Sequence, residues 1–420
     1  MDILIRHATI IDPSSPFHFQ KADLFIRNGV IFSINQPNID AEKIIDIPGL
    51  FVSPGWVDLF ANFCDPGYEF KETLETGSQA AASGGYTDVF VLPNTTPVLQ
   101  SKASIEYVVQ KGRYLPVTVH PIGAITKNAE GKDLTEMYDM EQSGAIAFSD
   151  GLNAVQSSGV LLKALQYIKA INRIIIQMPD DKTINPHGLM NEGIISTGLG
   201  LPGKPAIAEE LMIARDIELT KYSDSKLHFT GVSTKKGIEL IKKAKADGIN
   251  ITCSVTPYHL DFCDEDLAHY DTNLKVNPPF RTSQDREALK HAVIDGTIDC
   301  IASHHLPQDL DNKVVEFENA KNGMIGLQTA FSVVSTILPQ LTAERLVELF
   351  STNARKIFNL PVNSIQENSA ANLSLFAMKQ SWIFEKKDNL SKSSNSPFFG
   401  KELIGKPLGI INKDKLFLNQ

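Results

Sequence analysis

The sequence predicts an α/β protein in which a (β/α)8 barrel of the TIM type is flanked by a small β domain. Three observations predict it: apolar, β-rich runs alternate with helical patterns through the middle of the chain, there are eight such runs, and both ends show short β patterns instead. Strands that alternate with helices of about 10–15 residues indicate parallel βαβ units. Eight such units closing on themselves form a barrel of about 250 residues, which the span 53–358 accommodates.

The N-terminal part, residues 1–52, is expected to form short strands joined by turns and to supply the first half of the small β domain. The stretches ILIRHATIID and ADLFIRNGVIFSI are rich in β-branched and aromatic residues. Asn28-Gly29 separates two of these runs, and an Asn-Gly pair between apolar runs is a strong signal for a β-hairpin.

The middle of the chain supplies the eight strands and the helices of the barrel. The strands are predicted at 57–61, 87–92, 116–122, 145–148, 173–177, 226–230, 249–255 and 298–302. The helices are predicted at 71–83, 102–112, 133–142, 155–171, 206–222, 234–246, 284–295, 323–337 and 342–357. An open doubly wound sheet would require a G-x-G-x-x-G motif after its first strand, and Gly84-Gly85 precedes a strand instead.

The C-terminal part, residues 359–420, returns to short β patterns such as ANLSLFAM and SWIFEK, followed by a polar stretch that predicts a loop, KKDNLSKSSNSP. The two β-rich ends are expected to pair with each other into one domain.

Composition excludes several classes of function. The net charge of −9 argues against nucleic acid or an anionic membrane as the main partner. No apolar run approaches the roughly 20 residues that span a bilayer, and the first residues lack a signal peptide pattern. The four cysteines contain no C-x-x-C pair, which indicates neither a disulfide framework nor a thiolate metal site. A cytoplasmic protein is expected.

Functional residues of such a barrel are expected at the C-terminal ends of its strands. The residues after the predicted strands are Phe60-Ala61-Asn62, Pro93-Asn94-Thr95, Ser149-Asp150-Gly151, Gln177-Met178-Pro179-Asp180, Thr230-Gly231-Val232-Ser233 and Ser303-His304-His305, with Asn277 in the loop after strand seven. Phe60 and Asn62 are two residues apart in one strand and should therefore face the same way.

An ordered set of phrases gives a more specific indication. The set is PGWVDLFANFCDPGYEF, GAIAFSDG, LPGKPAIAEELMIARDIEL, LHFTGVST, VTPYHL, KVNPPFR, IASHHLP and NGMIGLQTAF. In this order the phrases cover nearly all of the chain, which resembles the dihydroorotases of the long bacterial type, in the amidohydrolase superfamily. The resemblance implies the barrel fold, but activity has to be argued from the site.

The resemblance also implies where metal ligands would lie. The family binds one or two divalent metal ions, usually zinc, and its first-strand H-x-H motif corresponds here to Phe60 and Asn62. The histidines of strands five and six correspond to Gln177 and Gly231, and the aspartate of strand eight, the family's catalytic base, corresponds to His304.

One acidic residue of the metal site has a counterpart. The family's F-S-D-D-G is Phe148-Ser149-Asp150-Gly151 here, and Asp150 is either the ligand aspartate or its neighbour. On the substrate side, the arginine after H-x-H corresponds to Cys64 and a late histidine to Gln308, whereas Asn94 and Asn277 match family substrate contacts.

The loss of a metal would be costly for hydrolysis. Metal-bound water has a pKa near 7 against 15.7 for free water, which at about 1.36 kcal/mol per pK unit is on the order of 12 kcal/mol of activation. A general base such as Asp150 contributes about 10²–10⁴-fold, at most about 5 kcal/mol. No bound metal cofactor and no ordinary binuclear mechanism are therefore expected, and Asp150 with His304 is the fallback metal pair.

Structural roles are the alternative for each singled-out residue. Phe60 is expected to pack as core, Asn62 to cap a loop, and Asn94 to fix the turn of PNTTP. Asp150 either acts chemically or tethers its own loop. His304 and His305 are adjacent in a strand and should face opposite sides, which argues against a shared metal. His228 and His259 are expected to be satisfied structural histidines.

Three functions remain open. The first expectation is a catalytically defective dihydroorotase homologue with a structural or regulatory role, for which the resemblance implies aspartate carbamoyltransferase as partner; a homo-oligomer is also expected. The second is an active cyclic amidohydrolase with a rebuilt metal site. The third is a module that binds a pyrimidine precursor through Asn94 and Asn277.

Overall fold

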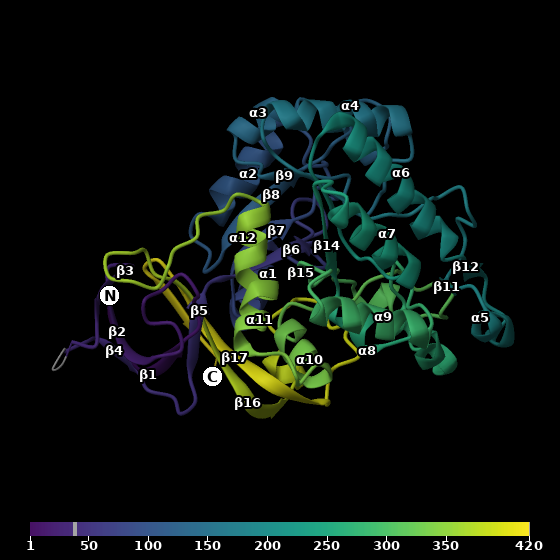
Figure 1. The fold of residues 1–420 in the computed structure, drawn as a ribbon. Helices are drawn as coiled ribbons and strands as arrows, with labels where there is room; N and C mark the ends of the chain where they lie inside the picture. The colour runs from purple at the N-terminus through teal and green to yellow at the C-terminus, as the bar shows by residue number, and fades with distance from the viewer. Residues whose placement is uncertain (37–39, 420) are drawn as a thin grey trace.

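The centre of the protein is a barrel of eight parallel strands (Figure 1). The computed structural model describes residues 1–36 and 40–419. Neighbouring strands pair in chain order: β6 (Trp56–Ala61), β7 (Tyr86–Val91), β8 (Thr118–Gly123), β9 (Ala147–Phe148), β10 (Ile175–Gln177), β13 (Leu227–Phe229), β14 (Ile251–Val255) and β15 (Cys300–Ile301). The predicted barrel and all eight of its predicted strands are confirmed.

The seam between the first and last strands is closed by a buried carboxylate. Asp58 of β6 accepts hydrogen bonds from the Ser303 backbone N–H at 2.6 Å and from Ser303 Oγ at 2.9 Å. The Asn62 N–H donates to the His305 carbonyl oxygen at 2.8 Å. Burial raises the pKa of Asp58, although the bonds from Ser303 oppose it. Sequence analysis did not single out Asp58, because its role depends on a partner 245 residues away.

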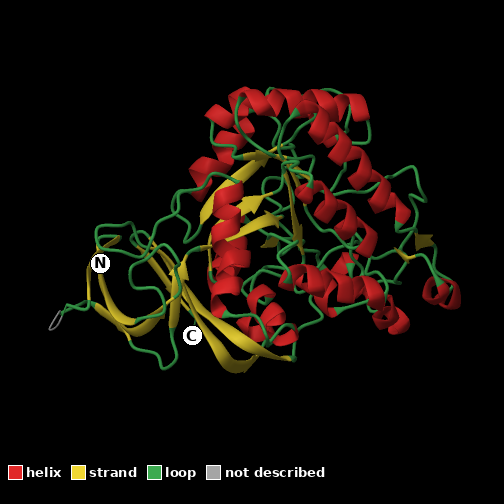
Figure 2. Ribbon diagram, viewed as in Figure 1, coloured by secondary structure: helices red, strands yellow, loops and turns green. Residues whose placement is uncertain are grey.

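Helices cover the outside of the barrel (Figure 2). They are α1 (Leu74–Ser83), α2 (Lys102–Gly112), α3 (Met137–Gln142), α4 (Ser158–Ala170), α6 (Ile207–Ser223), α7 (Lys235–Ala246), α8 (Pro257–Asp261), α9 (Ser283–Ile294), α10 (Ala330–Ile337), α11 (Ala343–Val347) and α12 (Asn353–Ile357). Several start at a side-chain cap: Thr234 Oγ1, for example, accepts from the Gly237 N–H at 3.0 Å, which fixes the start of α7.

Two predicted helices differ from the structure. The predicted helix 342–357 is divided into α11, a π-helical turn at 348–352, and α12. The predicted helix 323–337 is shorter in the structure and starts at Ala330. Gly323 has a φ of +139°, outside the helical region, and Met324 forms a β-bridge with His305 instead.

The second large sheet contains both ends of the chain. Its strand order is β18-β17-β16-β5-β1-β2-β3, with β4 paired to β1. The strands are β1 (Asp2–Ile10), β2 (Lys21–Arg27), β3 (Val30–Ile34), β4 (Lys43–Ile45), β5 (Phe51–Pro54), β16 (Asn372–Ile383), β17 (Glu402–Asn412) and β18 (Lys415–Leu418). Figure 1 shows the purple N-terminal strands beside the yellow C-terminal ones. The two chain ends therefore share one sheet, as expected. Within the two predicted ranges, 1–52 and 359–420, residues 37–39 and 420 lie outside the described residues.

The predicted Asn28-Gly29 hairpin is confirmed. Arg27 of β2 pairs with Val30 of β3, and Asn28 and Gly29 both have positive φ, at 49° and 77°. A two-residue loop of this kind matches the twist of the strands that it joins.

Smaller elements complete the chain. A two-stranded sheet joins β11 (Met190–Asn191) to β12 (Gly203–Lys204), with α5 (Ile194–Leu199) between them. Short 3-10 helices lie at Lys127–Ala129, Asp264–His269, Thr272–Leu274, Leu310–Asn312 and Lys386–Asp388. Among the described residues, no helix combines the length and apolar character needed to cross a membrane.

A buried ion pair joins the barrel to the sheet. Arg355 of α12 donates to Asp88 Oδ2 at 2.6 Å, to the Gly55 carbonyl oxygen at 2.7 Å and to Asn372 Oδ1 of β16 at 2.8 Å. His120 Nε2 lies 2.9 Å from the other Asp88 oxygen. Burial alone would raise the pKa of Asp88, but Arg355 and then His120 outweigh it and hold that pKa well below its usual range.

Candidate functional site

The mouth of the barrel, where the C-terminal ends of the strands meet, holds very little free space. The cavity there has a volume of about 10 Å³, which is about what one water molecule needs. The cavity is lined by Phe60, Leu92, Leu152, Tyr258, Val276, Asn277, His304, His305, Leu306 and Gly323. Most of these side chains are apolar, so the mouth is packed as a hydrophobic core.

Phe60 and His304 form the centre of this packing. The two ring centroids are 4.4 Å apart, with an interplanar angle of 32°. Phe60 is 1% exposed, and His304 is buried in a left-handed backbone conformation with a φ of 44°. Phe60 thus packs as core, as the sequence predicts.

Gly231 makes room for the His304 ring. A Cβ atom at position 231 would lie 2.7 Å from His304 Cε1, closer than real Cβ contacts come, and the φ of +66° also favours glycine. Of three positions at which the resemblance implies metal chemistry, Phe60 and Gly231 therefore both lie against the third, His304.

Asn62 and Gln177, the other two positions that correspond to histidines of the family, are also hydrogen-bonded to the protein. Asn62 Oδ1 accepts from the Cys64 N–H at 2.8 Å, so Asn62 caps its loop as expected. Gln177 Nε2 donates to Asp216 Oδ2 of α6 at 3.3 Å, and Gln177 Oε1 accepts from the Val155 N–H at 3.5 Å. Burial raises the pKa of Asp216 to about 6, although Arg215 opposes the rise.

Asp150 is committed to a neighbouring loop. Its Oδ1 accepts from the Thr126 N–H at 2.9 Å and its Oδ2 from Thr126 Oγ1 at 2.5 Å. The expected tether of its own loop is therefore corrected: Asp150, which follows β9, holds the loop after β8. Burial raises the pKa of Asp150 to about 6, and the bonds from Thr126 limit the rise.

A chain of hydrogen bonds between side chains leads through the barrel to His304. Thr252 Oγ1 lies 2.9 Å from His228 Nδ1, and His228 Nε2 lies 3.0 Å from Ser254 Oγ. Ser254 donates to Thr230 Oγ1 at 2.9 Å, and Thr230 Oγ1 lies 2.7 Å from His304 Nε2. Because Ser254 donates to Thr230, His228 Nε2–H donates to Ser254 and His304 Nε2 accepts from Thr230. His228 is the satisfied barrel histidine that the sequence predicts.

Three buried histidines of the barrel favour the neutral form. Burial lowers the pKa of His228, of His259 and of His304 to about 3 in each case. His259 Nδ1 lies 2.7 Å from Thr256 Oγ1 and its Nε2 lies 3.0 Å from the Pro278 carbonyl oxygen, which supports the expected structural role.

A His304→Gln variant should have a weaker dependence of stability on pH. The pKa of His304 is about 3 in the folded protein and about 6.5 in an unfolded chain. As the pH falls, His304 is therefore protonated in the unfolded chain before it is protonated in the folded protein. This stabilises the unfolded state, so below about pH 6.5 the free energy of unfolding falls by about 1.4 kcal/mol per pH unit. Between pH 7 and pH 5 the variant should lose about 2 kcal/mol less than the wild type.

Urea unfolding at pH 7 and pH 5 measures this difference. His187→Gln, at an exposed histidine in the loop after β10, is the matched control. Equal pH slopes for the wild type and His304→Gln would show that His304 is not held neutral by its surroundings.

The two predicted substrate contacts are bonded to the protein. Asn94 Nδ2 donates to the Asp150 carbonyl oxygen at 3.1 Å, and Asn94 Oδ1 accepts from the Leu152 N–H at 2.9 Å. Asn94 therefore holds the loop after β9, which corrects the expectation that it fixes its own turn. Asn277 Oδ1 accepts from Lys204 Nζ at 2.9 Å.

The substrate-side positions Cys64 and Gln308 are also buried. Gln308 Oε1 accepts from Lys71 Nζ at 2.9 Å, and Gln308 Nε2 donates to the Asn322 carbonyl oxygen at 2.9 Å. Burial raises the pKa of the Cys64 thiol to about 12, which leaves it in the poorly reactive thiol form.

His305 also lines the mouth cavity, but its ring nitrogens bond to a separate cluster. Its Nε2 lies 3.3 Å from Glu72 Oε2, and its Nδ1 accepts from the Gly326 N–H at 3.2 Å. Glu72 also accepts from Ser391 Oγ and, at 3.1 Å, from the Lys392 N–H. Burial opposes ionisation of Glu72, but the hydrogen bond and charge of His305 lower its pKa overall. The expectation that His304 and His305 face opposite sides of a strand is corrected: both follow β15 and both line the mouth cavity, although their ring nitrogens have different partners. Sequence analysis missed Glu72 because its partners are distant in the chain.

The donor set does not fit the metal centre that the resemblance implies. Across residues 1–36 and 40–419, no three His, Cys, Asp or Glu side chains come together in an arrangement that could hold a metal ion. The fallback pair is also occupied, since Asp150 is bonded to Thr126 and His304 Nε2 to Thr230.

Comparison with known proteins identifies the family. Residues 49–237 match the family model described as "Dihydro-orotase-like". A dihydroorotase from Caldanaerobacter subterraneus subsp. tengcongensis is 41% identical over 411 residues, which cover 96% of this chain and 94% of that protein. The chain belongs to the dihydroorotase family. A dihydroorotase from Syntrophus aciditrophicus is a further relative, 38% identical over 412 residues, which cover 97% of this chain and 96% of that protein.

Solved structures share the fold of this dihydroorotase-family chain. An L-hydantoinase (dihydropyrimidinase) from Arthrobacter aurescens aligns with a TM-score of 0.87 at 24% identity, over all of this chain and 96% of that one. A dihydropyrimidinase from Brevibacillus agri aligns with a TM-score of 0.84 at 19% identity, over all of this chain and 95% of that one. These similarities show that the chain shares the fold of both enzymes.

Proposed function

We propose that this dihydroorotase-family chain acts in pyrimidine biosynthesis without catalysing the metal-dependent hydrolysis of dihydroorotate. One observation carries the proposal: Phe60, Gly231 and His304 pack together in the barrel mouth, which leaves room for about one water molecule. A cyclic substrate and an activated water would both need space there.

The chemistry of the remaining groups supports the same conclusion. Phenylalanine and glycine offer no side-chain donor atom, and amides are poor zinc ligands beside imidazole and carboxylate. Without a metal, activation of water lacks on the order of 12 kcal/mol, and Asp150 as a general base would restore at most about 5 kcal/mol.

A second candidate is an active dihydroorotase or related cyclic amidohydrolase, and the comparisons favour it over the noncatalytic role. The relatives, at 38% and 41% identity over nearly the whole chain, carry the name dihydroorotase. For such an enzyme to work, the barrel mouth would have to open. Asp150, whose pKa is raised to about 6, would then serve as the general base.

Metal content and activity separate the two candidates. The protein is purified without added zinc and analysed for metal, and dihydroorotate hydrolysis and carbamoyl aspartate cyclisation are assayed before and after zinc addition. The Caldanaerobacter relative is the positive control. We expect much less than one zinc per chain and rates at least about 10⁴-fold below the control. About one zinc per chain, with a rate within about tenfold of the control that a chelator abolishes, would establish the active enzyme.

The noncatalytic role requires a partner, and the family resemblance suggests aspartate carbamoyltransferase. The chain would then have a structural or regulatory function in that assembly, and it is also expected to self-associate. Size-exclusion chromatography of the chain alone and mixed with the aspartate carbamoyltransferase of the same organism tests both points. Separate elution at micromolar concentrations of both proteins would contradict the partnership.

Binding of a pyrimidine precursor at the mouth has less support. The amide groups of Asn94 and Asn277 are bonded to protein, and the cavity is small. A thermal-shift screen with carbamoyl aspartate, dihydroorotate and orotate tests this alternative.

A further inference from the structure

A second cavity lies on the side of the molecule, where α1 meets the C-terminal strands. Its volume is about 530 Å³, within the range of small-molecule sites, and much larger than the space at the mouth. Its walls come from α1, the segment before α10, and the chain from β16 to the end of β18. The lining residues that matter for binding are Gln79, Gln328, Trp382, Asp388, Lys406 and Phe417.

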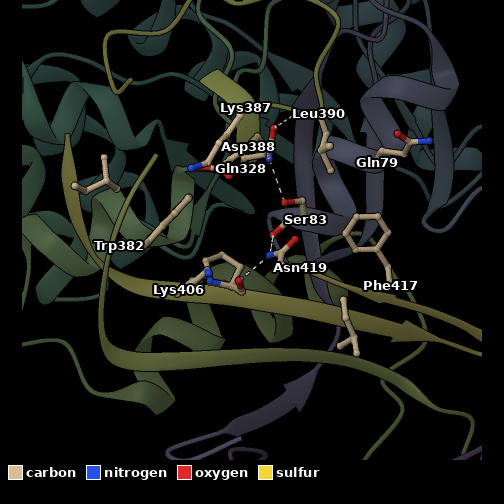
Figure 3. Close-up of a pocket in the computed structure, with 13 residues that line it drawn as sticks. Gln79, Ser83, Gln328, Trp382, Lys387, Asp388, Leu390, Lys406, Phe417 and Asn419 are labelled. Atoms are coloured by element: carbon tan, nitrogen blue, oxygen red, sulfur yellow. Dashed lines mark hydrogen bonds between the residues drawn. The ribbon is translucent and has the colours of Figure 1, made fainter. Parts of the chain in front are cut away.

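Hydrogen bonds fix the back wall of this pocket (Figure 3). Gln328 Nε2 donates to Ser83 Oγ at 3.1 Å and to the Asp388 carbonyl oxygen at 2.8 Å, and Gln328 Oε1 accepts from the Leu390 N–H at 2.8 Å. Asn419 Nδ2 donates to the Ser83 and Pro407 carbonyl oxygens. Because five segments are bonded together here, the pocket has a preformed shape.

The indole of Trp382 is also held in place. Its Nε1–H is within hydrogen-bonding distance of Ser332 Oγ, at 3.1 Å, and of the Gly405 carbonyl oxygen, at 3.2 Å. The polar edge of the ring therefore faces the protein, and the rest of the half-buried ring lines the pocket. Figure 3 shows Trp382 on one side of the pocket and Phe417 on the other.

Lys406 brings a positive charge to the same place. Its Nζ lies 5.9 Å from the centroid of the Trp382 ring system. Within residues 1–36 and 40–419, no ion pair engages Lys406, whereas Lys387 pairs with Glu385. Asp388 accepts from the Glu385 N–H at 3.1 Å, so its carboxylate stabilises its own turn. Lys406 is therefore the lysine of the pocket wall that no carboxylate pairs with among the described residues, and the Asp388 carboxylate, which also lines the pocket, is engaged by the Glu385 N–H.

We propose that this pocket binds a small planar anion, with its aromatic ring against Trp382 and its phosphate or carboxylate group on Lys406. Aromatic rings gain from stacking on a fixed indole, and an anion on an ammonium group makes a charge-assisted hydrogen bond. The exposed Gln79 amide is available at the opposite wall. The proposal is independent of whether the barrel mouth is catalytic.

Isothermal titration calorimetry of the full-length chain with 1-naphthyl phosphate tests the proposal. We expect one site per chain, at least about tenfold weaker binding to Lys406→Gln and Trp382→Leu, and at least about tenfold weaker binding of inorganic phosphate or naphthalenemethanol to the wild type. Lys379→Gln is the matched control, because Lys379 is exposed on β16 but does not line the pocket. It should bind within about twofold of the wild type.

Thermal melts first establish that each variant is folded. Absence of saturable binding up to about 5 mM probe would overturn the proposal. So would equal affinities of the wild type and folded Lys406→Gln, or binding of inorganic phosphate as tight as that of 1-naphthyl phosphate.

Discussion

Replacement of Arg355 by methionine is expected to lower the free energy of unfolding by about 3–5 kcal/mol, because it leaves a buried carboxylate without its cation. Arg355 and Asp88 are 3% and 8% exposed, and their N–O distance is 2.6 Å. The variant also loses the bonds from Arg355 to Gly55 and Asn372, which connect the barrel to the sheet. Urea unfolding at pH 7 measures the change.

The pH dependence of this loss identifies its cause. In the wild type the pKa of Asp88 is held low, so its contribution to stability is present above the ordinary carboxyl pKa of about 4 and is lost as the pH falls toward the folded-state pKa. In Arg355→Met the pKa of Asp88 should rise, so the deficit should shrink on acidification. Arg27→Met, at a half-exposed pair with Asp2, is the control and should cost about 0–1 kcal/mol. Equal losses in the two variants would contradict the assignment.

Phe60→Ala is expected to cost about 3–5 kcal/mol, because it removes a fully buried ring and leaves a cavity among side chains that cannot collapse completely. Phe60 is 1% exposed and stacks on His304. The same substitution should open the barrel mouth, which is otherwise filled. Chemical denaturation gives the stability, and a crystal structure of the variant under xenon pressure would show whether the cavity is present.

Phe70→Ala is the matched control for this prediction, since Phe70 is 57% exposed in the loop after β6. Its loss should lie within about 0.5 kcal/mol of zero. If Phe60→Ala were equally harmless, Phe60 would not belong to a packed mouth, and the main argument for a noncatalytic barrel would fail.

The sequence predicts the barrel well because each βα unit is a local pattern. Strand runs such as 87–92 and the helix 102–112 follow from residues that are close in the chain, and the Asn28-Gly29 hairpin follows from two residues alone. The division of the predicted helix 342–357 by a π-helical turn was missed, because no local residue pattern specifies such a turn.

The site was predictable in its positions but not in its contacts. Strand periodicity places Phe60, Gly231 and His304 at the mouth, yet their mutual packing depends on a left-handed His304 and on space beside Gly231. The bonds from Asn94 and Asp150 to other loops, and the Glu72 cluster with His305 and Ser391, join residues 24 to 319 positions apart. Such pairs leave no local trace in one sequence.

The contacts among the side chains at the mouth also restrict which single substitutions these positions can accept. A histidine introduced at position 231 alone would collide with the His304 ring, and an aspartate at position 304 alone would remove the ring that Phe60 stacks on. Substitutions at touching residues are not additive, so the cost of either replacement depends on whether the other is present. A new metal ligand could therefore be introduced at this mouth only by replacing several side chains together.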